Sequence, residues 1–354
     1  MSQSFNKHDV LRGYSENRMT LGPIRERVTS PIARRLSSAV PHEAVPAATD
    51  SVCLTCRKED PQSALPVRMP ADATGLETTL AEYRGFSNRE YYNESKDAQA
   101  RQSYYADIDW KSDGKSLFEQ LSKKLQDSHT TVLDYRPSKY VYPWVDLQPN
   151  GQLKSIYSNL TIAVEKAIVE DWEVGQVRRQ AENGLAFAAL SPEAAATAFA
   201  TQEAAALNCE HVVPQSWFGK TQPERGDLHH LFACDSRCNS RRGNLPYDEF
   251  KNPKDDWRDQ CGTIGPDRTF EPAGGKGAAA RATLYFLLRY PGVVDSYDAT
   301  DIQRMLDWNE RFPPDLWEKH RNVAIEELQG NRNPLIDFPE MANAVDFTRG
   351  LKGA

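Results

Sequence analysis

The segment Cys209–Phe218 places an acid and a histidine side by side, immediately before two valines and a proline. The valines favour extended backbone, and Pro214 ends it. Because successive side chains of a strand point to opposite faces, Glu210 and His211 would project differently. Such a pair suits a carboxylate that binds a metal beside an imidazole that acts as a base. For this pair alone, the alternative is a solvated acid beside a hydrogen-bonded histidine.

A second polar segment, Gly226–Asn244, is rich in His, Asn, Arg and Cys. Its first part alternates briefly between apolar and polar residues, which predicts a short strand, and its second part predicts a turn into a short helix. Asn239 and Arg242 are three residues apart and would share a helix face. A neutral Asn oxygen is a suitable ligand for a hard cation such as Mg²⁺. With Arg237 and Arg241, Arg242 offers contacts to phosphate, and a solvated basic face is the equal alternative.

The surrounding sequence predicts the elements that must position these residues. Ser116–Gln126 carries four large apolar residues on one helical face, and Leu153–Thr161 is typical of a strand. Leu185–Ala206 is rich in Ala and predicts a helix. Three further helices are predicted from apolar periodicity and from start and stop signals, at Gly277–Arg289, Asp301–Arg311 and Asp315–Gln329.

Composition limits the class of protein. The chain has 354 residues, of which 39% are hydrophobic and 26% charged, as in soluble globular proteins. It contains no run of about 18 apolar residues that could span a membrane. Residues 1–30 contain no apolar segment typical of a Sec signal peptide. The net charge of -7 argues against a globally basic nucleic-acid binder but is compatible with a local basic cleft.

The first 95 residues show no apolar period that could build a core, and the part from Thr29 to Asp60 is rich in Ser, Pro and Ala. We therefore expect a flexible N-terminal segment over residues 1–95, with or without a targeting or loading role. A folded domain over residues 96–345 and a C-terminal tail over residues 346–354 complete the expected organisation.

In order, these motifs describe a strand, a loop, a strand and a helix, with a His on the first strand and an Asn on the helix. This pattern resembles the endonuclease I family, which belongs to the His-Me finger (ββα-metal) nucleases. The resemblance covers about residues 100 to 340. It is carried by EHVVPQS at Glu210–Ser216, DLHHL at Asp227–Leu231, NSRRGN at Asn239–Asn244, KGAAARA at Lys276–Ala282 and QGNRNP at Gln329–Pro334.

The resemblance implies an α+β fold, with mixed helices around a ββα-metal finger core. It implies that His211 is the general base, and that Glu210 and Asn239 hold one divalent cation, Mg²⁺ or Mn²⁺. Arg242 would neutralise charge on the cleaved phosphate. Nucleic-acid contacts are expected from four further arginines, Arg237, Arg241, Arg281 and Arg332.

The expected function is a metal-dependent, largely sequence-nonspecific endonuclease that hydrolyses phosphodiester bonds in DNA or RNA. Two alternatives remain open. One is a catalytically inactive relative that binds nucleic acid. The other is the same nuclease acting as a delivered antibacterial toxin, with an inhibitor or immunity protein as partner. We expect a monomer without a membrane partner, which is either exported by a route independent of a signal peptide or cytoplasmic.

Four of the six cysteines, Cys209, Cys234, Cys238 and Cys261, fall close to the two motifs. We expect at least three of them to cluster and to brace the site, as two disulfides or as one structural Zn²⁺ site. Separate free thiols are the alternative. Cys53 and Cys56 form only half of a metal-binding motif.

Overall fold

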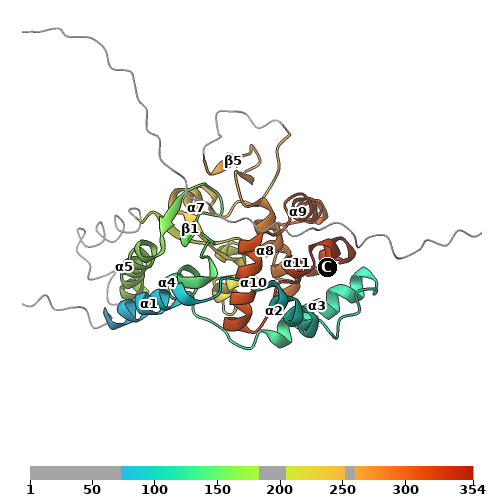
Figure 1. Cartoon of the computed structure of the whole chain (residues 1–354). Helices are drawn as coiled ribbons and strands as arrows, with labels where there is room; N and C mark the ends of the chain where they lie inside the picture. Colours follow the sequence, from blue (N-terminus) through green and yellow to red (C-terminus); the bar gives the residue numbers. More distant parts are fainter. Residues whose placement is uncertain (1–72, 183–204, 252–259, 354) are drawn as a thin grey trace, which may run out of the picture. The chain divides into compact units, whose positions relative to one another are not determined.

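The computed structural model describes residues 73–182, 205–251 and 260–353. All of them belong to one compact unit, Val67–Ala354. This unit combines many helices with three two-stranded antiparallel sheets, so the predicted α+β class is confirmed (Figure 1). The helices are α1 (Ala73–Gly85), α2 (Glu94–Tyr104), α3 (Gly114–Ser128), α4 (Pro137–Tyr140), α5 (Val164–Glu182), α7 (Ser236–Arg242), α8 (Lys276–Arg289), α9 (Ala299–Arg311), α10 (Leu316–Gln329) and α11 (Pro334–Asp337). The strands are β1 (Gln152–Lys154), β2 (Thr161–Ala163), β3 (Leu207–His211), β4 (Leu231–Asp235), β5 (Gly262–Ile264) and β6 (Phe270–Pro272).

Strands β3 and β4 form the sheet that separates two hydrophobic cores. They pair with Glu210 opposite Phe232 and His211 opposite Leu231. Because side chains alternate along a strand, Phe232 enters one core while Leu231 enters the other. The two strands are therefore buried on both faces, which fixes their register.

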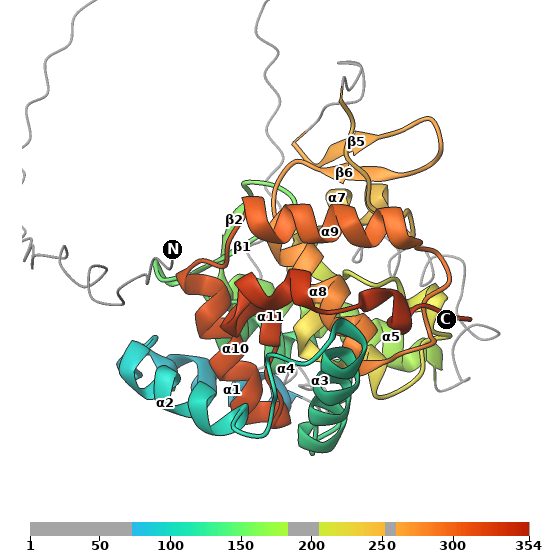
Figure 2. The same ribbon diagram turned by 90° about the vertical axis from the view of Figure 1, so that its right-hand side faces the viewer.

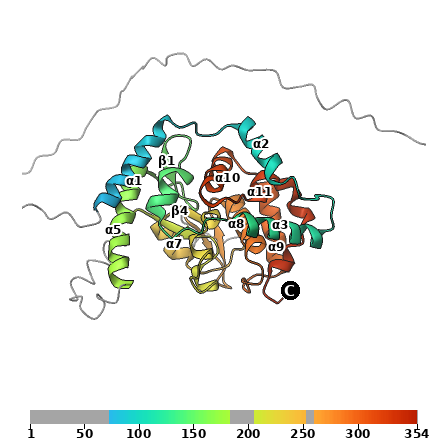
Figure 3. The same cartoon turned by 90° about the horizontal axis from the view of Figure 1, so that it is seen from below.

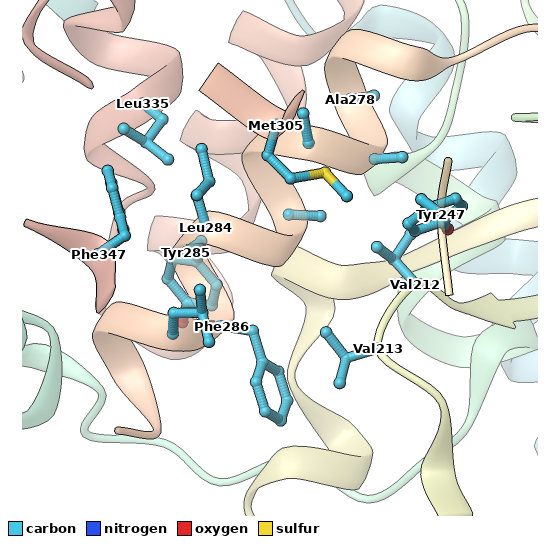
Figure 4. Packing of buried hydrophobic residues seen from close by; sticks show 14 of the residues in the cluster. Val212, Val213, Tyr247, Ala278, Leu284, Tyr285, Phe286, Met305, Leu335 and Phe347 are labelled. Atoms are coloured by element: carbon cyan, nitrogen blue, oxygen red, sulfur yellow. The ribbon is translucent and has the colours of Figure 1, made fainter. Parts of the chain in front are cut away.

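Helix α8 lies in the middle of the larger core. Every residue from Gly277 to Leu288 is buried, as expected for a helix that is apolar on all sides. Figure 4 shows Leu284 and Phe286 of this helix with Met305 of α9 and Val213, which follows β3. The segment after β3 is thus packed directly against the most buried helix of the unit.

The smaller core is covered by α1 and α5, which lie side by side in Figures 1 and 3. Leu80 of α1 packs against this core, and the ring of Phe86 stacks on Trp144 at 4.9 Å between centroids. Residues 73–95 of the predicted N-terminal segment therefore contact the domain, and residues 1–72 lie outside the described part. At the other end, Phe347 is 1% exposed, so residues 346–353 also pack onto the domain.

The predicted helices in the second half of the chain are confirmed within a residue or two as α8, α9 and α10, and Ser116–Gln126 is confirmed as part of α3. The single strand predicted over Leu153–Thr161 is wrong, because a turn divides it into β1 and β2. Most of the helix predicted over Leu185–Ala206 lies outside the described residues. None of the described helices is long and apolar enough to cross a membrane.

Candidate active site at the end of strand β3

Glu210 and His211 are the last two residues of β3, and both side chains are buried. The strand ends here because Val212 and Val213 leave the ladder and Pro214 cannot donate a hydrogen bond to it. Helix α7 follows β4 directly, with Asp235 as its N-cap, and therefore starts beside β3. Two strands and a helix thus bring the two predicted motifs together.

The Glu210 carboxylate is 2% exposed and is held by two side-chain donors. The Tyr157 hydroxyl donates to Oε1 at 2.7 Å, and Nη1 of Arg242 donates to the same oxygen at 2.8 Å. Burial raises the pKa of the Glu210 carboxyl above its usual value, although Arg242 and Tyr157 offset part of this effect. Both side-chain donors bind Oε1, and the main-chain N–H of His211 also favours the charged carboxylate.

The His211 ring is fixed by a main-chain contact. Its Nε2 lies 3.0 Å from the carbonyl oxygen of Arg225. A carbonyl only accepts, so Nε2 carries the proton, and the basic lone pair of the neutral ring is on Nδ1. Tyr135 and His230 pack beside the ring, at 4.8 and 5.3 Å between centroids. These contacts hold the ring in one orientation.

Asn239, on α7, is tied to β3 through its amide nitrogen. Nδ2 donates to Oδ1 of Asn208 at 2.8 Å and to the carbonyl oxygen of Cys209 at 3.3 Å. The amide is thereby oriented, and its oxygen Oδ1 remains as the side-chain acceptor. Asn239 therefore contacts the two residues that directly precede Glu210 on β3, and its role as a metal ligand stays a prediction.

The side-chain oxygen atoms of Glu210 and Asn239 are of the types that bind a hard divalent cation. A carboxylate oxygen and an amide oxygen are ligands that Mg²⁺ uses together with several waters. Within the described ranges, no group of three or more His, Cys, Asp and Glu residues could hold a metal ion. The pair Glu210 and Asn239 thus supplies two protein oxygens, and waters or substrate would supply the others.

A sequence model of the family described as Endonuclease I matches residues 114–340, which is more than half of the chain. The chain belongs to the endonuclease I family. The predicted family is thereby confirmed, and with it the prediction of an endonuclease-family enzyme.

Curated relatives agree with this membership. The "Extracellular ribonuclease" of Bacillus subtilis (strain 168) is 33% identical over 157 residues, which are 39% of this chain and 53% of the relative. An "Extracellular deoxyribonuclease" of Aeromonas hydrophila is 31% identical over 155 residues, which are 37% of this chain and 66% of the relative. A "Periplasmic deoxyribonuclease" of the same organism is 29% identical over 157 residues, which are 38% of this chain and 64% of the relative. The chain spans about half to two thirds of the length of these relatives.

Arg242 of this endonuclease I chain has a different environment from the one predicted. Its guanidinium is 0% exposed, donates to the carbonyl oxygens of His211 and Val212 at 3.0 and 2.7 Å, and pairs with Glu210. It also lies over the ring of Tyr247, at 4.6 Å from the centroid. These contacts hold the end of β3, and the predicted contact of Arg242 with the cleaved phosphate stays a prediction.

The other two arginines of α7 lie nearer the surface. The Arg237 side chain is 78% exposed, and its Nη2 lies 3.1 Å from Oδ2 of Asp235. Arg241 is half-buried near the end of the helix. Both stay candidates for backbone phosphate contacts beside the site.

Arg281 and Arg332 are enclosed, unlike the predicted nucleic-acid contacts. Arg281 is 1% exposed and donates Nε to Oε1 of Glu318 at 2.8 Å. Arg332 is 0% exposed, and its guanidinium is surrounded by the carboxylates of Asp97, Glu326 and Asp337. These contacts join helices within the fold, and the predicted contacts of both arginines with nucleic acid stay predictions.

The four cysteines near the motifs form one disulfide, whereas two disulfides or one structural Zn²⁺ site were predicted, with free thiols as the alternative. Cys238 of α7 is bonded to Cys261, which precedes β5. Cys209 and Cys234 are separate buried thiols, whose pKa values burial raises well above the usual range. The disulfide excludes a four-thiolate zinc site, and it ties the helix that carries Asn239 to the β5–β6 pair above it in Figure 2. Cys53 and Cys56 lie outside the described residues.

Three side chains near the site were missed from the sequence. Tyr157 binds Glu210, Tyr135 packs on His211, and Arg225 supplies the carbonyl that orients the ring. The tyrosines lie 53 and 76 residues before the residues that they contact, and buried tyrosines of this kind have no local signal. Only the nearness of Arg225 to the second motif could have pointed to it.

Two cavities lie near these elements. One, of about 250 Å³, is lined by Tyr135 and Arg225, which contact His211. The larger one, of about 450 Å³, lies at the start of α8. Glu210, His211 and Asn239 line neither cavity, but the smaller one is lined by residues that contact His211.

Proposed function

We propose that this protein is a metal-dependent endonuclease whose β3, β4 and α7 act as a ββα-metal finger. The observation that supports this most is the meeting of the two motifs at the end of β3. Glu210 and His211 end the strand, and Nδ2 of Asn239 donates to the Asn208 side chain and to the Cys209 carbonyl directly before them.

In this proposal Glu210 and Asn239 hold one divalent cation, Mg²⁺ or Mn²⁺. When bound, the cation supplies charge stabilisation at the scissile phosphate and its leaving oxygen. His211 takes a proton from the attacking water at Nδ1, while the Arg225 carbonyl keeps Nε2 protonated and stabilises the ring as it becomes charged.

The substrate is DNA or RNA, since the relatives are named for both. Low sequence specificity is expected because these groups act on the phosphodiester and not on base edges. Arg237 and Arg241 would add salt-dependent contacts to the backbone. The relatives are named as extracellular or periplasmic, and a disulfide suits an oxidising compartment, so we infer that the enzyme acts outside the cytoplasm.

The test is nicking of supercoiled plasmid and of a single-stranded RNA by the wild type and by His211→Ala. General-base removal should lower the rate by about 10²–10⁴-fold while leaving the fold and nucleic-acid binding intact. Activity should also disappear with EDTA and return with Mn²⁺ or Mg²⁺.

A matched pair of variants tests the cation site. Asn239→Ala should raise the cation concentration needed for activity, whereas Asn159→Ala, at an exposed position between β1 and β2, should not. Full activity of His211→Ala, or of the wild type after exhaustive chelation, would refute the proposal.

A further inference from the structure

The Glu210 carboxylate is the end of a chain of buried hydrogen bonds. The Tyr157 hydroxyl donates to Oε1 and also contacts the Tyr247 hydroxyl. Because Tyr157 has one hydroxyl proton and gives it to Glu210, Tyr247 must donate to Tyr157. The order of donation is thus Tyr247 to Tyr157 to Glu210.

Both tyrosines are 0% exposed and are fixed from several sides. The Tyr157 ring packs against the ring of Phe270 in β6, at 5.4 Å between centroids. Tyr247 lies under the Arg242 guanidinium, and Figure 4 shows its ring beside Val212. Hydroxyl groups held in this way cannot turn to other acceptors, so their direction defines the direction of the carboxylate.

The geometry has a specific consequence for the carboxylate. Two donors on Oε1 fix the rotation about the last side-chain bond of Glu210, since any rotation would break two hydrogen bonds at once. Oε2 then points to a defined place. Groups that orient a ligating carboxylate in this way commonly set metal affinity as strongly as the ligand itself.

We propose that Tyr157, supported by Tyr247, is a positioning residue that fixes Glu210 so that Oε2 faces the divalent cation. This inference rests on the proposed function, because it takes Glu210 as a cation ligand. Neither tyrosine touches the substrate. They restrict the rotation of the Glu210 carboxylate before the divalent cation binds, so that less conformational entropy is lost on binding.

The experiment compares Tyr157→Phe with Tyr142→Phe. Tyr142 is equally buried, but its hydroxyl has no hydrogen-bond partner among the described residues, so its removal is a matched control. Two quantities are measured for each full-length variant. The first is Mn²⁺ binding without nucleic acid, by titration calorimetry. The second is the Mn²⁺ concentration for half-maximal plasmid nicking, together with the rate at saturating Mn²⁺.

For Tyr157→Phe we expect the Mn²⁺ dissociation constant and the Mn²⁺ concentration for half-maximal nicking, together called the Mn²⁺ constants, each to rise about 10–100-fold. The rate at saturating Mn²⁺ should recover most of the wild-type value, a separation that a general loss of structure would not produce. Tyr142→Phe should bind Mn²⁺ like the wild type. Unchanged Mn²⁺ constants in a folded Tyr157→Phe variant would overturn the proposal.

If Tyr157→Phe does not fold, Tyr247→Phe decides, because it removes only the donor to Tyr157. A rise in the Mn²⁺ constants, smaller than that expected for Tyr157→Phe, would support the proposal, and constants equal to those of the wild type would overturn it. Glu210→Gln separates this inference from the proposed function. If Glu210→Gln abolishes Mn²⁺ binding while the tyrosine variants bind normally, only the positioning role fails. If Glu210→Gln binds Mn²⁺ and cleaves normally, the proposed function fails.

Discussion

Replacement of Arg242 by Met distinguishes a residue that holds β3 from one that contacts the phosphate. The substitution keeps a long side chain but removes every donor of a guanidinium that is 0% exposed. It leaves the buried Glu210 carboxylate without its cationic partner, at a cost of about 3–5 kcal/mol in unfolding free energy. The carbonyl oxygens of His211 and Val212 also lose their donor, at about 1–3 kcal/mol for each unsatisfied group. We therefore expect a loss of at least about 5 kcal/mol in total.

The assay is thermal unfolding at pH 7.5, followed by circular dichroism. In a domain of this size, 1 kcal/mol corresponds to about 2–4 °C, so Tm should fall by about 10 °C or more. Arg237→Met is the matched control on the same helix. Its side chain is 78% exposed, so its Tm should change by no more than about 2 °C. The double variant Glu210→Gln with Arg242→Met should recover part of the loss, because the uncompensated charge has been removed.

One result would refute this reasoning. If Arg242→Met kept the wild-type Tm but lost nicking activity at saturating Mn²⁺, the arginine would act on the substrate, as the family resemblance suggested. The hydrogen bonds to Glu210 and to the two carbonyls would then contribute nothing measurable to stability.

Three further predictions follow from other buried groups. Burial lowers the pKa of His229 to about 4, so the unfolded chain binds the proton of this histidine more readily than the folded protein does. Tm should therefore fall as the pH drops from about 6.5 to 4, and it should fall less steeply in His229→Asn. A Tm that stays constant or rises over this pH range would contradict this prediction. The disulfide closes a loop with a sequence separation of 23, so Cys238→Ser should lower the free energy of unfolding by about 3 kcal/mol, as measured by chemical denaturation. An unchanged denaturation midpoint would show that the crosslink does not stabilise the fold. A chain that starts at residue 67 should cleave plasmid like the full-length protein. One that starts at residue 96 should unfold at lower temperature because it lacks α1 and the Phe86 ring on Trp144; equal Tm values would show that α1 is dispensable.

Much of the candidate site could be predicted because its signals are local. The order of Glu210 and His211 on β3 follows from alternation along a strand and from the valines and proline that end it. The predicted short helix is present as α7, which follows β4 directly and without the predicted turn, and it carries Asn239 to the strand. The long helices were predictable for the same reason, since caps and apolar periods are contained in each segment.

The arginines could not be assigned in this way. Arg332 and Arg237 are the same residue type in motifs of similar polarity, yet one is 0% exposed among three carboxylates and the other has a side chain that is 78% exposed. The partners of Arg332 come from residues as far away as Asp97, 235 positions earlier in the chain. No local pattern encodes such a pairing, so the sequence could not predict that Arg332 joins helices.

The site therefore depends on neighbouring residues with opposite requirements. The buried Glu210 carboxylate must keep its charge, and the Arg242 guanidinium and the Tyr157 hydroxyl, which both donate to Oε1, stabilise that charge. His211 must accept a proton at its other ring nitrogen in the proposed reaction, and the carbonyl that accepts from Nε2 fixes the tautomer this requires. Adjacent positions on a strand can have such different surroundings because their side chains enter different layers of the protein. Substitutions on the Glu210 side should therefore change cation dependence first, and substitutions around Tyr135 and Arg225 should change the pH dependence of cleavage first. A Tyr135→Phe variant that altered the Mn²⁺ constant but not the pH profile would contradict this separation.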